Sequence, residues 1–79
     1  MVARVLNRLN NRQCEGALAP GRYADGGGLY LAVSENGARS WLFFWRVNGT
    51  RHAIGLGAFR DVALAKAREE ASALRTKIR

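Results

Sequence analysis

Two Asn-Gly dipeptides, Asn36-Gly37 and Asn48-Gly49, constrain the fold of this chain more than any other feature. Asn-Gly is typical of a two-residue type I′ hairpin turn, because both residues accept a positive φ. The first dipeptide follows an alternating run in which Leu29, Leu31 and Val33 share one face. An aromatic run separates the two dipeptides, and a third short run follows the second. The sequence therefore predicts a three-stranded antiparallel meander. The predicted strands span residues 29–35, 39–47 and 50–56.

The period of the pattern changes after the third run. Five apolar positions then recur at spacings of three and four, which is typical of an amphipathic helix over residues 62–78. These positions are Leu64, Ala67, Ala71, Leu74 and Ile78. Asp61 is the expected N-cap of this helix, and the basic residues along the helix are expected to be solvated. Residues 1–21 are expected to form an arm or a short helix over Ala3–Gln13. The fold class is thus α+β, with residues 22–79 forming a sheet whose apolar face is covered by one C-terminal helix.

The period-two alternation also assigns each strand side chain to a face of the sheet. The expected core positions are Leu29, Leu31, Val33, Trp41, Phe43, Trp45, Val47, Ile54 and Leu56. The expected outward positions are Tyr30, Ala32, Ser34, Leu42, Phe44, Arg46, Arg51, Ala53 and Gly55. His52 alternates with Ile54, which predicts a partly buried imidazole.

The run DGGG at residues 25–28 raises the question of a phosphate-binding loop. Such a loop needs a helix directly after it, so that the free backbone N–H groups of the helix point at the anion. Here a predicted strand follows Gly28, and no Gly-Lys-Ser or Gly-Lys-Thr ending is present. We therefore interpret the glycines as a turn into the first strand with unusual φ values, within which Asp25 is expected to bond to backbone N–H groups.

The charge balance indicates the class of partner. Thirteen Lys and Arg residues oppose six Asp and Glu residues, for a net charge of +7, and eleven of the thirteen are Arg. Because the Arg guanidinium meets phosphates and guanine edges with paired hydrogen bonds, nucleic acid is the first candidate partner. A single cysteine, Cys14, and the lack of a secretory signal or membrane-length apolar run predict a cytoplasmic protein in which Cys14 is inert.

The order of these motifs resembles the N-terminal arm-type DNA-binding domain of tyrosine recombinases, the integrases of phages and genomic islands. The similarity runs from Pro20 to Leu74. The motifs that carry it are D-G-G-G-L-Y-L-x-V, N-G, S-W-x-F-x-W-R, N-G, G-L-G and L-A-x-A-R-E-x-A. The resemblance implies a sheet packed on a C-terminal helix, with one sheet face docked in the major groove of arm-type sites. It implies double-stranded DNA and other integrase protomers as partners, in the integration of a mobile element such as a prophage.

The resemblance also implies that the catalytic residues of a tyrosine recombinase lie elsewhere in a longer parent protein. The chain has one His and no His-x-x-Arg motif, so we expect a binding module with no catalytic residue, metal or cofactor. The candidate DNA-binding residues are Tyr30, Ser34, Arg39, Arg46, Thr50 and Arg51.

Two outward positions depart from the pattern of the family, whose middle strand often carries basic residues. Leu42 and Phe44 stand there instead. They fit three environments: thymine methyl groups in the major groove, a position beneath the N-terminal arm, or a protein partner. The alternative function is accordingly a protein–protein interaction module that uses Leu42 and Phe44. A third is an RNA-binding sheet on which Tyr30 and Phe44 stack bases.

Overall fold

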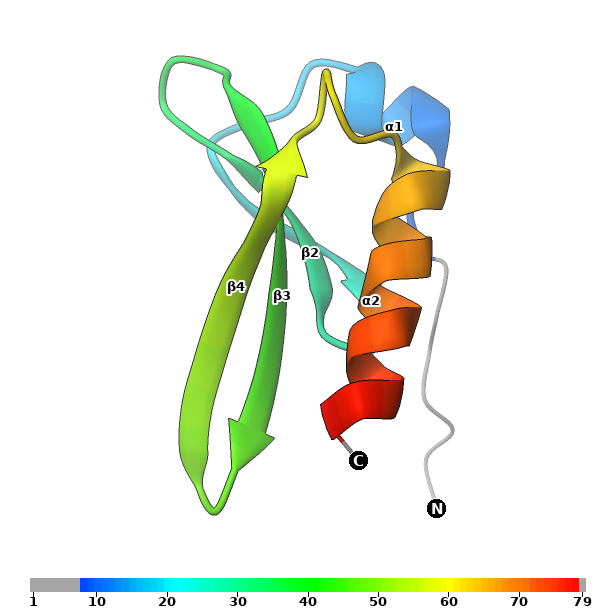
Figure 1. The fold of residues 1–79 in the computed structure, drawn as a ribbon. Coiled ribbons are helices and arrows are strands. Elements are labelled where there is room, and N and C mark those ends of the chain that lie inside the picture. Colours follow the sequence, from blue (N-terminus) through cyan, green and yellow to red (C-terminus); the bar gives the residue numbers. More distant parts are fainter. Residues whose placement is uncertain (1–7, 79) are drawn as a thin grey trace.

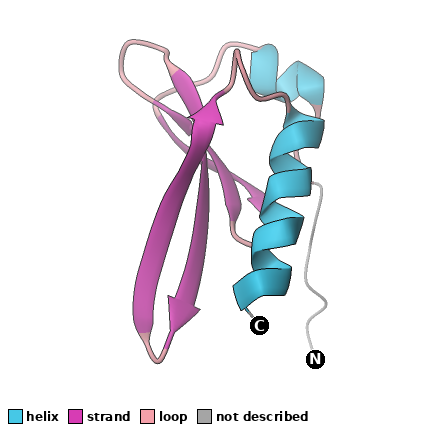
Figure 2. Cartoon of the chain, viewed as in Figure 1, coloured by secondary structure: helices cyan, strands magenta, loops and turns pink. Residues whose placement is uncertain are grey.

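The computed structural model describes residues 8–78, which form a twisted antiparallel sheet with both helices on one of its faces (Figure 1; Figure 2). The elements are α1 (Asn11–Glu15), β1 (Gly21–Gly26), β2 (Leu29–Val33), β3 (Arg39–Val47), β4 (Thr50–Ala58) and α2 (Leu64–Ile78). The α+β class and the C-terminal helix are confirmed. Neither helix of residues 8–78 is long and apolar enough to cross a lipid bilayer.

The sheet has four strands in the order β1-β2-β3-β4, so the prediction of three strands was wrong. The missed strand is β1, which pairs with β2 from Gly21 opposite Val33 to Gly26 opposite Leu29, with a bulge near its end. Its sequence, GRYADG, lacks the alternation of apolar residues that marks the other strands. The reason is that the buried position of β1 is occupied by the carboxylate of Asp25, a residue that sequence patterns assign to loops.

The two Asn-Gly turns differ in conformation. Asn48 and Gly49 both have positive φ, 49° and 81°, as expected of a type I′ turn. Gly37 has a φ of 88°, whereas Asn36 is not among the described residues with positive φ. The first connection is therefore a three-residue loop, closed by a hydrogen bond from the Ser34 N–H to the Ala38 carbonyl (2.9 Å). A type I turn followed by a left-handed glycine is the usual form of such a loop.

The three glycines at the end of β1 and in the connection to β2 form a turn, as predicted, and a strand follows them. Gly26, Gly27 and Gly28 have φ values of 113°, 63° and 98°, a region that favours glycine. A Cβ atom on Gly28 would lie 2.5 Å from the Phe44 carbonyl oxygen, so the close approach of two backbone segments also requires glycine there. The Phe44 N–H donates to the Gly28 carbonyl (2.9 Å) across this approach.

The core lies between the sheet and α2. Its buried side chains from the sheet are Leu29, Leu31, Val33, Trp41 and Phe43, and those from the helices are Cys14, Leu64, Ala67 and Ala71. The small Ala67 and Ala71 side chains let α2 approach the sheet closely, and the Trp41 indole N–H donates to the Val62 carbonyl (2.6 Å). This part of the predicted core is confirmed.

The free end of the β3–β4 hairpin diverges from α2 (Figure 1). Val47 and Ile54, both predicted in the core, are 43% and 42% exposed. Trp45 is half-buried and stacks on His52, with ring centroids 5.3 Å apart, and His52 itself is exposed. The predictions that Val47 and Ile54 lie in the core and that His52 is partly buried were therefore wrong. Alternation correctly assigned their face, but it carries no information on how far along the hairpin the helix extends.

The start of α2 and the N-terminal helix also differ from expectation. α2 begins at Leu64, and the Ala63 carbonyl accepts from the Ala67 N–H, so Ala63 occupies the N-cap and Asp61 lies in the preceding turn. The N-terminal helix is α1, over Asn11–Glu15, in place of Ala3–Gln13, of which residues 3–7 lie outside the described part of the chain.

Candidate nucleic-acid interface

The sheet face turned away from α1 and α2 is the candidate interface, and we call it the outer face. Strand pairing arranges its side chains in four rows. The rows are Arg22-Ala32-Ser40, Ala24-Tyr30-Leu42-Gly55, Phe44-Ala53 and Arg46-Arg51. Small residues therefore fill much of this face, and its large side chains gather toward the free half of the β3–β4 hairpin. Both helices contact the opposite face (Figure 1).

The outer face carries positive charge without negative charge. Arg22, Arg46 and Arg51 project from it, while the single acidic residue within the four strands, Asp25, is buried on the other face. Within residues 8–78, none of these three arginines forms an ion pair. Arg46 and Arg51 stand directly opposite each other across the β3–β4 pair. Like charges in that position repel each other, so an anion bound between them is favoured.

Phe44 lies at the centre of the aromatic and basic part of the outer face. The Tyr30 and Phe44 rings pack edge to face, with centroids 5.1 Å apart and ring planes at 83°. The guanidinium carbons of Arg51 and Arg22 lie 4.3 and 5.3 Å from its ring centroid. A hollow beside the ring is lined by Gly28, Tyr30, Phe44, Trp45, Arg46 and Arg51. Phe44 is thus covered by polar and charged neighbours.

The structure brings together three of the six predicted binding residues, Tyr30, Arg46 and Arg51. They line the same hollow on the outer face. Thr50 is exposed at the hairpin tip, on the strand face that also carries His52.

The remaining two predicted residues lie toward the other end of the sheet. Ser34 is exposed in the first hairpin loop, where its hydroxyl donates to the side chain of Asn36 (2.5 Å) and accepts from the Ala38 N–H (3.1 Å). Arg39 is half-buried on the helix side, and its guanidinium donates to the carbonyls of Cys14 and Gly16. Arg39 therefore contacts the N-terminal segment.

A comparison with known families shows to which kind of domain this sheet and its outer face belong. The model of one family, described as an Arm DNA-binding domain, matches residues 8–79. The chain belongs to this family. The resemblance seen in the motifs is thereby confirmed, since arm DNA-binding domains are found in tyrosine recombinases. The match also extends through α1, a region in which the sequence motifs gave no resemblance. A search of curated proteins finds no match.

Membership in the family identifies the chain as a DNA-binding domain of the integrase type, with double-stranded DNA as its partner. An arm DNA-binding domain is a binding module and not a catalytic one. Residues 8–78 also bring no three His, Cys, Asp or Glu side chains together in a metal-binding group.

Arg22 is the residue of the outer face that sequence reasoning missed. It lies in β1, the strand that was not predicted, and its side chain falls on the outer face because Arg22 pairs with Ala32. The two-residue spacing of Tyr23 and Asp25 could have revealed it, because both side chains point to the core side of the sheet. A strand at this position sends Arg22 and Ala24 outward.

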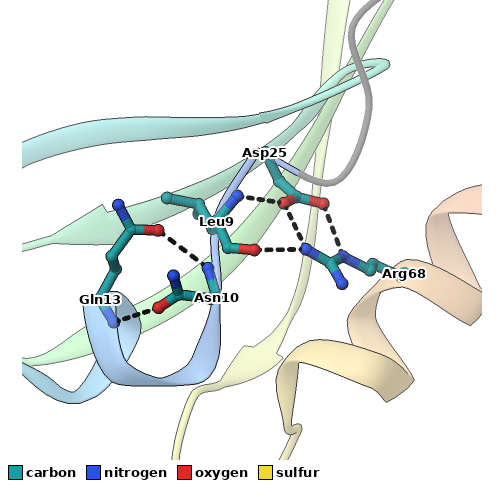
Figure 3. Close-up of polar contacts among 5 residues, drawn as sticks. All are labelled: Leu9, Asn10, Gln13, Asp25 and Arg68. Atoms are coloured by element: carbon teal, nitrogen blue, oxygen red, sulfur yellow. Dashed lines mark hydrogen bonds and ion pairs between the residues drawn. The ribbon is translucent and has the colours of Figure 1, made fainter.

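A buried ion pair fixes the scaffold behind the outer face (Figure 3). Asp25 Oδ2 and Oδ1 accept from Arg68 Nε (3.0 Å) and Nη2 (2.9 Å), and the Leu9 N–H also donates to Oδ1 (2.9 Å). Arg68 Nη2 donates in addition to the Leu9 carbonyl (2.6 Å). One carboxylate therefore ties β1, α2 and the N-terminal segment together. The expectations that Asp25 bonds within the glycine turn and that Arg68 is solvated were wrong.

This arrangement sets the protonation state of Asp25. Burial alone would raise the pKa of this carboxyl group, but the hydrogen bonds from Arg68 and Leu9 and the positive charge of Arg68 outweigh burial. The pKa of Asp25 is therefore lower than its ordinary value, and the carboxylate stays charged at neutral pH. Burial, followed by the negative charge of Asp25, raises the pKa of the Cys14 thiol, which favours the unreactive thiol form.

The N-terminal segment lies on the helix side of the sheet. Cys14 of α1 is fully buried in the same cluster as Ala67 and Ala71 of α2. In α1 itself, Asn10 and Gln13 exchange hydrogen bonds between side chain and backbone as a capping box (Figure 3). Leu42 and Phe44 face the opposite way, so residues 8–16 do not cover them. The interpretation that places these two residues beneath the arm is wrong for the described part of the chain.

Proposed function

We propose that this domain docks its outer face in the major groove of arm-type DNA sites and thereby positions a tyrosine recombinase for the integration of a mobile element, such as a prophage. The observation that carries the proposal is the set of three arginines, without a carboxylate, on the sheet face that the helices leave free. Positive charge without internal partners favours a polyanion as the ligand.

The shape of the β3–β4 hairpin supports this mode of docking. Its free half is a two-stranded ribbon that diverges from α2 (Figure 1). The major groove of B-DNA is about 12 Å wide and admits a two-stranded β-ribbon, whose strands lie about 4.8 Å apart. Ala32, Ala53 and Gly55 on the outer face add little height above the backbone. The large side chains of the ribbon, Phe44, Arg46 and Arg51, are therefore the ones placed to reach into the groove.

The proposed roles follow from position. Arg46 and Arg51, opposite each other on the ribbon, are placed to bind a phosphate between them or the O6 and N7 atoms of a guanine. The Tyr30 hydroxyl is the adjacent hydrogen-bonding group. Thr50 and Ser34, beside the two hairpin turns, are proposed as phosphate contacts. Arg39, whose guanidinium already binds two carbonyls, is proposed to act indirectly, by fixing the N-terminal segment.

The alternative of a protein-interaction surface rests on Leu42 and Phe44, and the contacts of Phe44 favour DNA. Two guanidinium groups and the Tyr30 ring lie against Phe44, so the side chain is not a free apolar anchor. Leu42 is itself partly buried. Apolar anchors of protein interfaces fill desolvated pockets of a partner, whereas a ring that carries cations suits an anionic ligand.

The test compares two double variants by fluorescence anisotropy with a short labelled duplex of random sequence, over a range of salt concentrations. Arg46→Ala/Arg51→Ala removes two charges from the outer face, and Lys66→Ala/Lys77→Ala removes two exposed charges from α2. If both arginines contact phosphates, the slope of log K against log salt should fall by about 0.9 for each of them. The control variant should keep the wild-type slope.

Three results would contradict the proposal. A wild-type slope near zero would exclude phosphate contacts. Equal losses in the two double variants would show a general charge effect. A larger loss in the α2 variant would place the DNA on the helix side. Self-association of the wild-type chain that Leu42→Ser abolishes, together with weak DNA binding, would favour the protein-interaction module.

A further inference from the structure

We propose that Phe44 is a positioning residue for DNA binding: its ring holds the guanidinium groups of Arg22 and Arg51 in place before DNA arrives. This inference rests on the proposed function of the outer face. The two arginines come from β1 and β4, the outermost strands of the sheet, and Phe44 lies between them on β3. One central ring thus gathers positive charges from both edges of the sheet.

The geometry of the cluster supports a fixed arrangement. The Arg51 guanidinium carbon lies 4.3 Å from the centre of the Phe44 ring and that of Arg22 lies 5.3 Å from it, both within the range of cation–π attraction. The Tyr30 and Phe44 rings pack edge to face at 83°, a favoured aromatic geometry, and we infer that this contact limits rotation of Phe44. Tyr30 therefore fixes the Phe44 ring, and the ring in turn fixes the two guanidinium groups.

Contact with a ring leaves the hydrogen-bond donors of an arginine free. A guanidinium group attracts a ring electrostatically, while its five N–H groups stay available for a phosphate or a guanine edge. Within residues 8–78, neither Arg22 nor Arg51 donates to a protein acceptor. Arg39, Arg68 and Arg75, by contrast, use their donors on protein carbonyls or on Asp25. The structure therefore separates arginines that build the fold from arginines that are held ready for a ligand.

This role accounts for an aromatic residue among the arginines of the outer face. Phe44 brings no charge, but it orders two charges from the neighbouring strands. An arginine that is ordered before binding loses less conformational freedom when it binds, and the affinity gains accordingly. We expect the loss of this ordering to weaken DNA binding about fivefold.

The test begins with the free protein. In NMR spectra of the wild-type chain, side-chain protons of Arg51 and Arg22 should show upfield ring-current shifts, and the Arg51 Nε–H group should be ordered. Phe44→Leu should abolish the ring-current shifts and the order of the Arg51 Nε–H group, and it should weaken DNA binding about fivefold. Phe44→Tyr, which keeps the ring, should preserve the shifts, the order and the affinity. Leu42→Ala, on the same strand and face, should leave the arginine shifts unchanged. Urea unfolding of each variant verifies that the domain is folded.

A second variant covers the case in which Phe44→Leu does not fold. Arg51→Lys keeps the charge but loses the planar group that rests on the ring. We expect weaker binding with an unchanged salt slope, because the number of charges on the face is the same. A residue that acted as a charge alone would show no loss of affinity.

The outcomes separate this inference from the proposed function. Normal DNA binding by Phe44→Leu, or the absence of ring-current shifts in a wild-type chain that binds DNA, overturns the role of Phe44 alone. Failure of the wild-type chain to bind DNA overturns the proposed function, and the DNA role of Phe44 with it.

Discussion

Replacing Arg68 with methionine should destabilise the domain strongly, because it leaves the Asp25 carboxylate buried without its cation. The Asp25 side chain is 3% exposed and that of Arg68 is 30% exposed. Water cannot replace the lost partner of Asp25, whereas Arg68 can turn toward solvent if Asp25 is removed. The same interaction should therefore yield two different losses, depending on which partner is replaced.

The expected magnitudes follow from this asymmetry. Removing one partner of a buried ion pair costs about 3–5 kcal/mol, and we expect Arg68→Met to cost about 3 kcal/mol, since the Leu9 N–H still donates to the carboxylate. Asp25→Asn should cost about 1–2 kcal/mol, because the amide oxygen can accept from the Leu9 N–H and the exposed part of Arg68 can be hydrated. A domain of this size has a free energy of unfolding of about 4–12 kcal/mol, so both losses are measurable.

The pH dependence of stability should change sign in the Arg68 variant. In the wild type, the pKa of Asp25 is lowered in the folded state. Asp25 therefore stabilises the fold above its unfolded pKa of about 3.9, and this contribution is lost as the pH falls through the folded pKa. In Arg68→Met, burial is opposed only by the Leu9 hydrogen bond and the charge of Arg75, and we expect the folded pKa to rise above the unfolded one. Stability should then be greatest below the unfolded pKa and be lost as the pH rises through the folded value.

The assay is urea unfolding, followed by tryptophan fluorescence, from neutral pH to below the unfolded pKa of Asp25 of about 3.9. Lys66→Met, at an exposed position of the same helix, is the matched control and should change stability by less than about 0.5 kcal/mol. The double variant Asp25→Asn/Arg68→Met should lack the pH dependence that Asp25 gives to the wild type and to Arg68→Met. Equal losses in the two single variants, or a wild-type pH profile in Arg68→Met, would refute the reasoning from unequal burial.

Two further predictions concern the backbone. Gly28→Ala should lower the free energy of unfolding by about 3 kcal/mol or more, because the new Cβ would lie 2.5 Å from a backbone oxygen. Gly49→Ala, with open space around its Cβ, should lower it by about 1 kcal/mol through left-handed backbone strain. Denaturant unfolding compares the two variants, and equal losses would contradict the close approach at Gly28. Ala63→Ser should stabilise the domain by about 1 kcal/mol, since a hydroxyl at the exposed N-cap can accept from free N–H groups of α2; an unchanged thermal midpoint would contradict this assignment.

The sequence predicted the features that depend on local pattern. The Asn-Gly dipeptides located both hairpins, although only Asn48-Gly49 adopts the type I′ form. Alternation assigned Trp41 and Phe43 to the core, and Tyr30, Arg46 and Arg51 to the opposite face. These predictions succeeded because a strand places its side chains by period alone.

The features that the sequence did not reveal depend on distant contacts. β1 was missed because its inward Asp25 is neutralised by Arg68, which lies 43 residues further along the chain. The exposure of Val47 and Ile54 depends on where α2 diverges from the sheet. Arg22 was absent from the predicted site for the same reason as its strand. A pattern within a short stretch of sequence carries no information on such distant pairs. A charged residue at a buried strand position, such as Asp25, is therefore assigned to a loop.

The two arginines that bind the N-terminal segment donate hydrogen bonds to its backbone carbonyls and not to its side chains. Arg68 binds the carbonyl of Leu9, and Arg39 binds those of Cys14 and Gly16. Any residue presents a carbonyl, so these hydrogen bonds do not themselves depend on the side chain at the bound position, whereas the packing of Cys14 in the core does. Within residues 8–16, these hydrogen bonds can therefore persist where the sequence offers no recognisable motif. A search for relatives of this domain should therefore rely on Arg39 and Arg68 more than on the N-terminal segment that they bind.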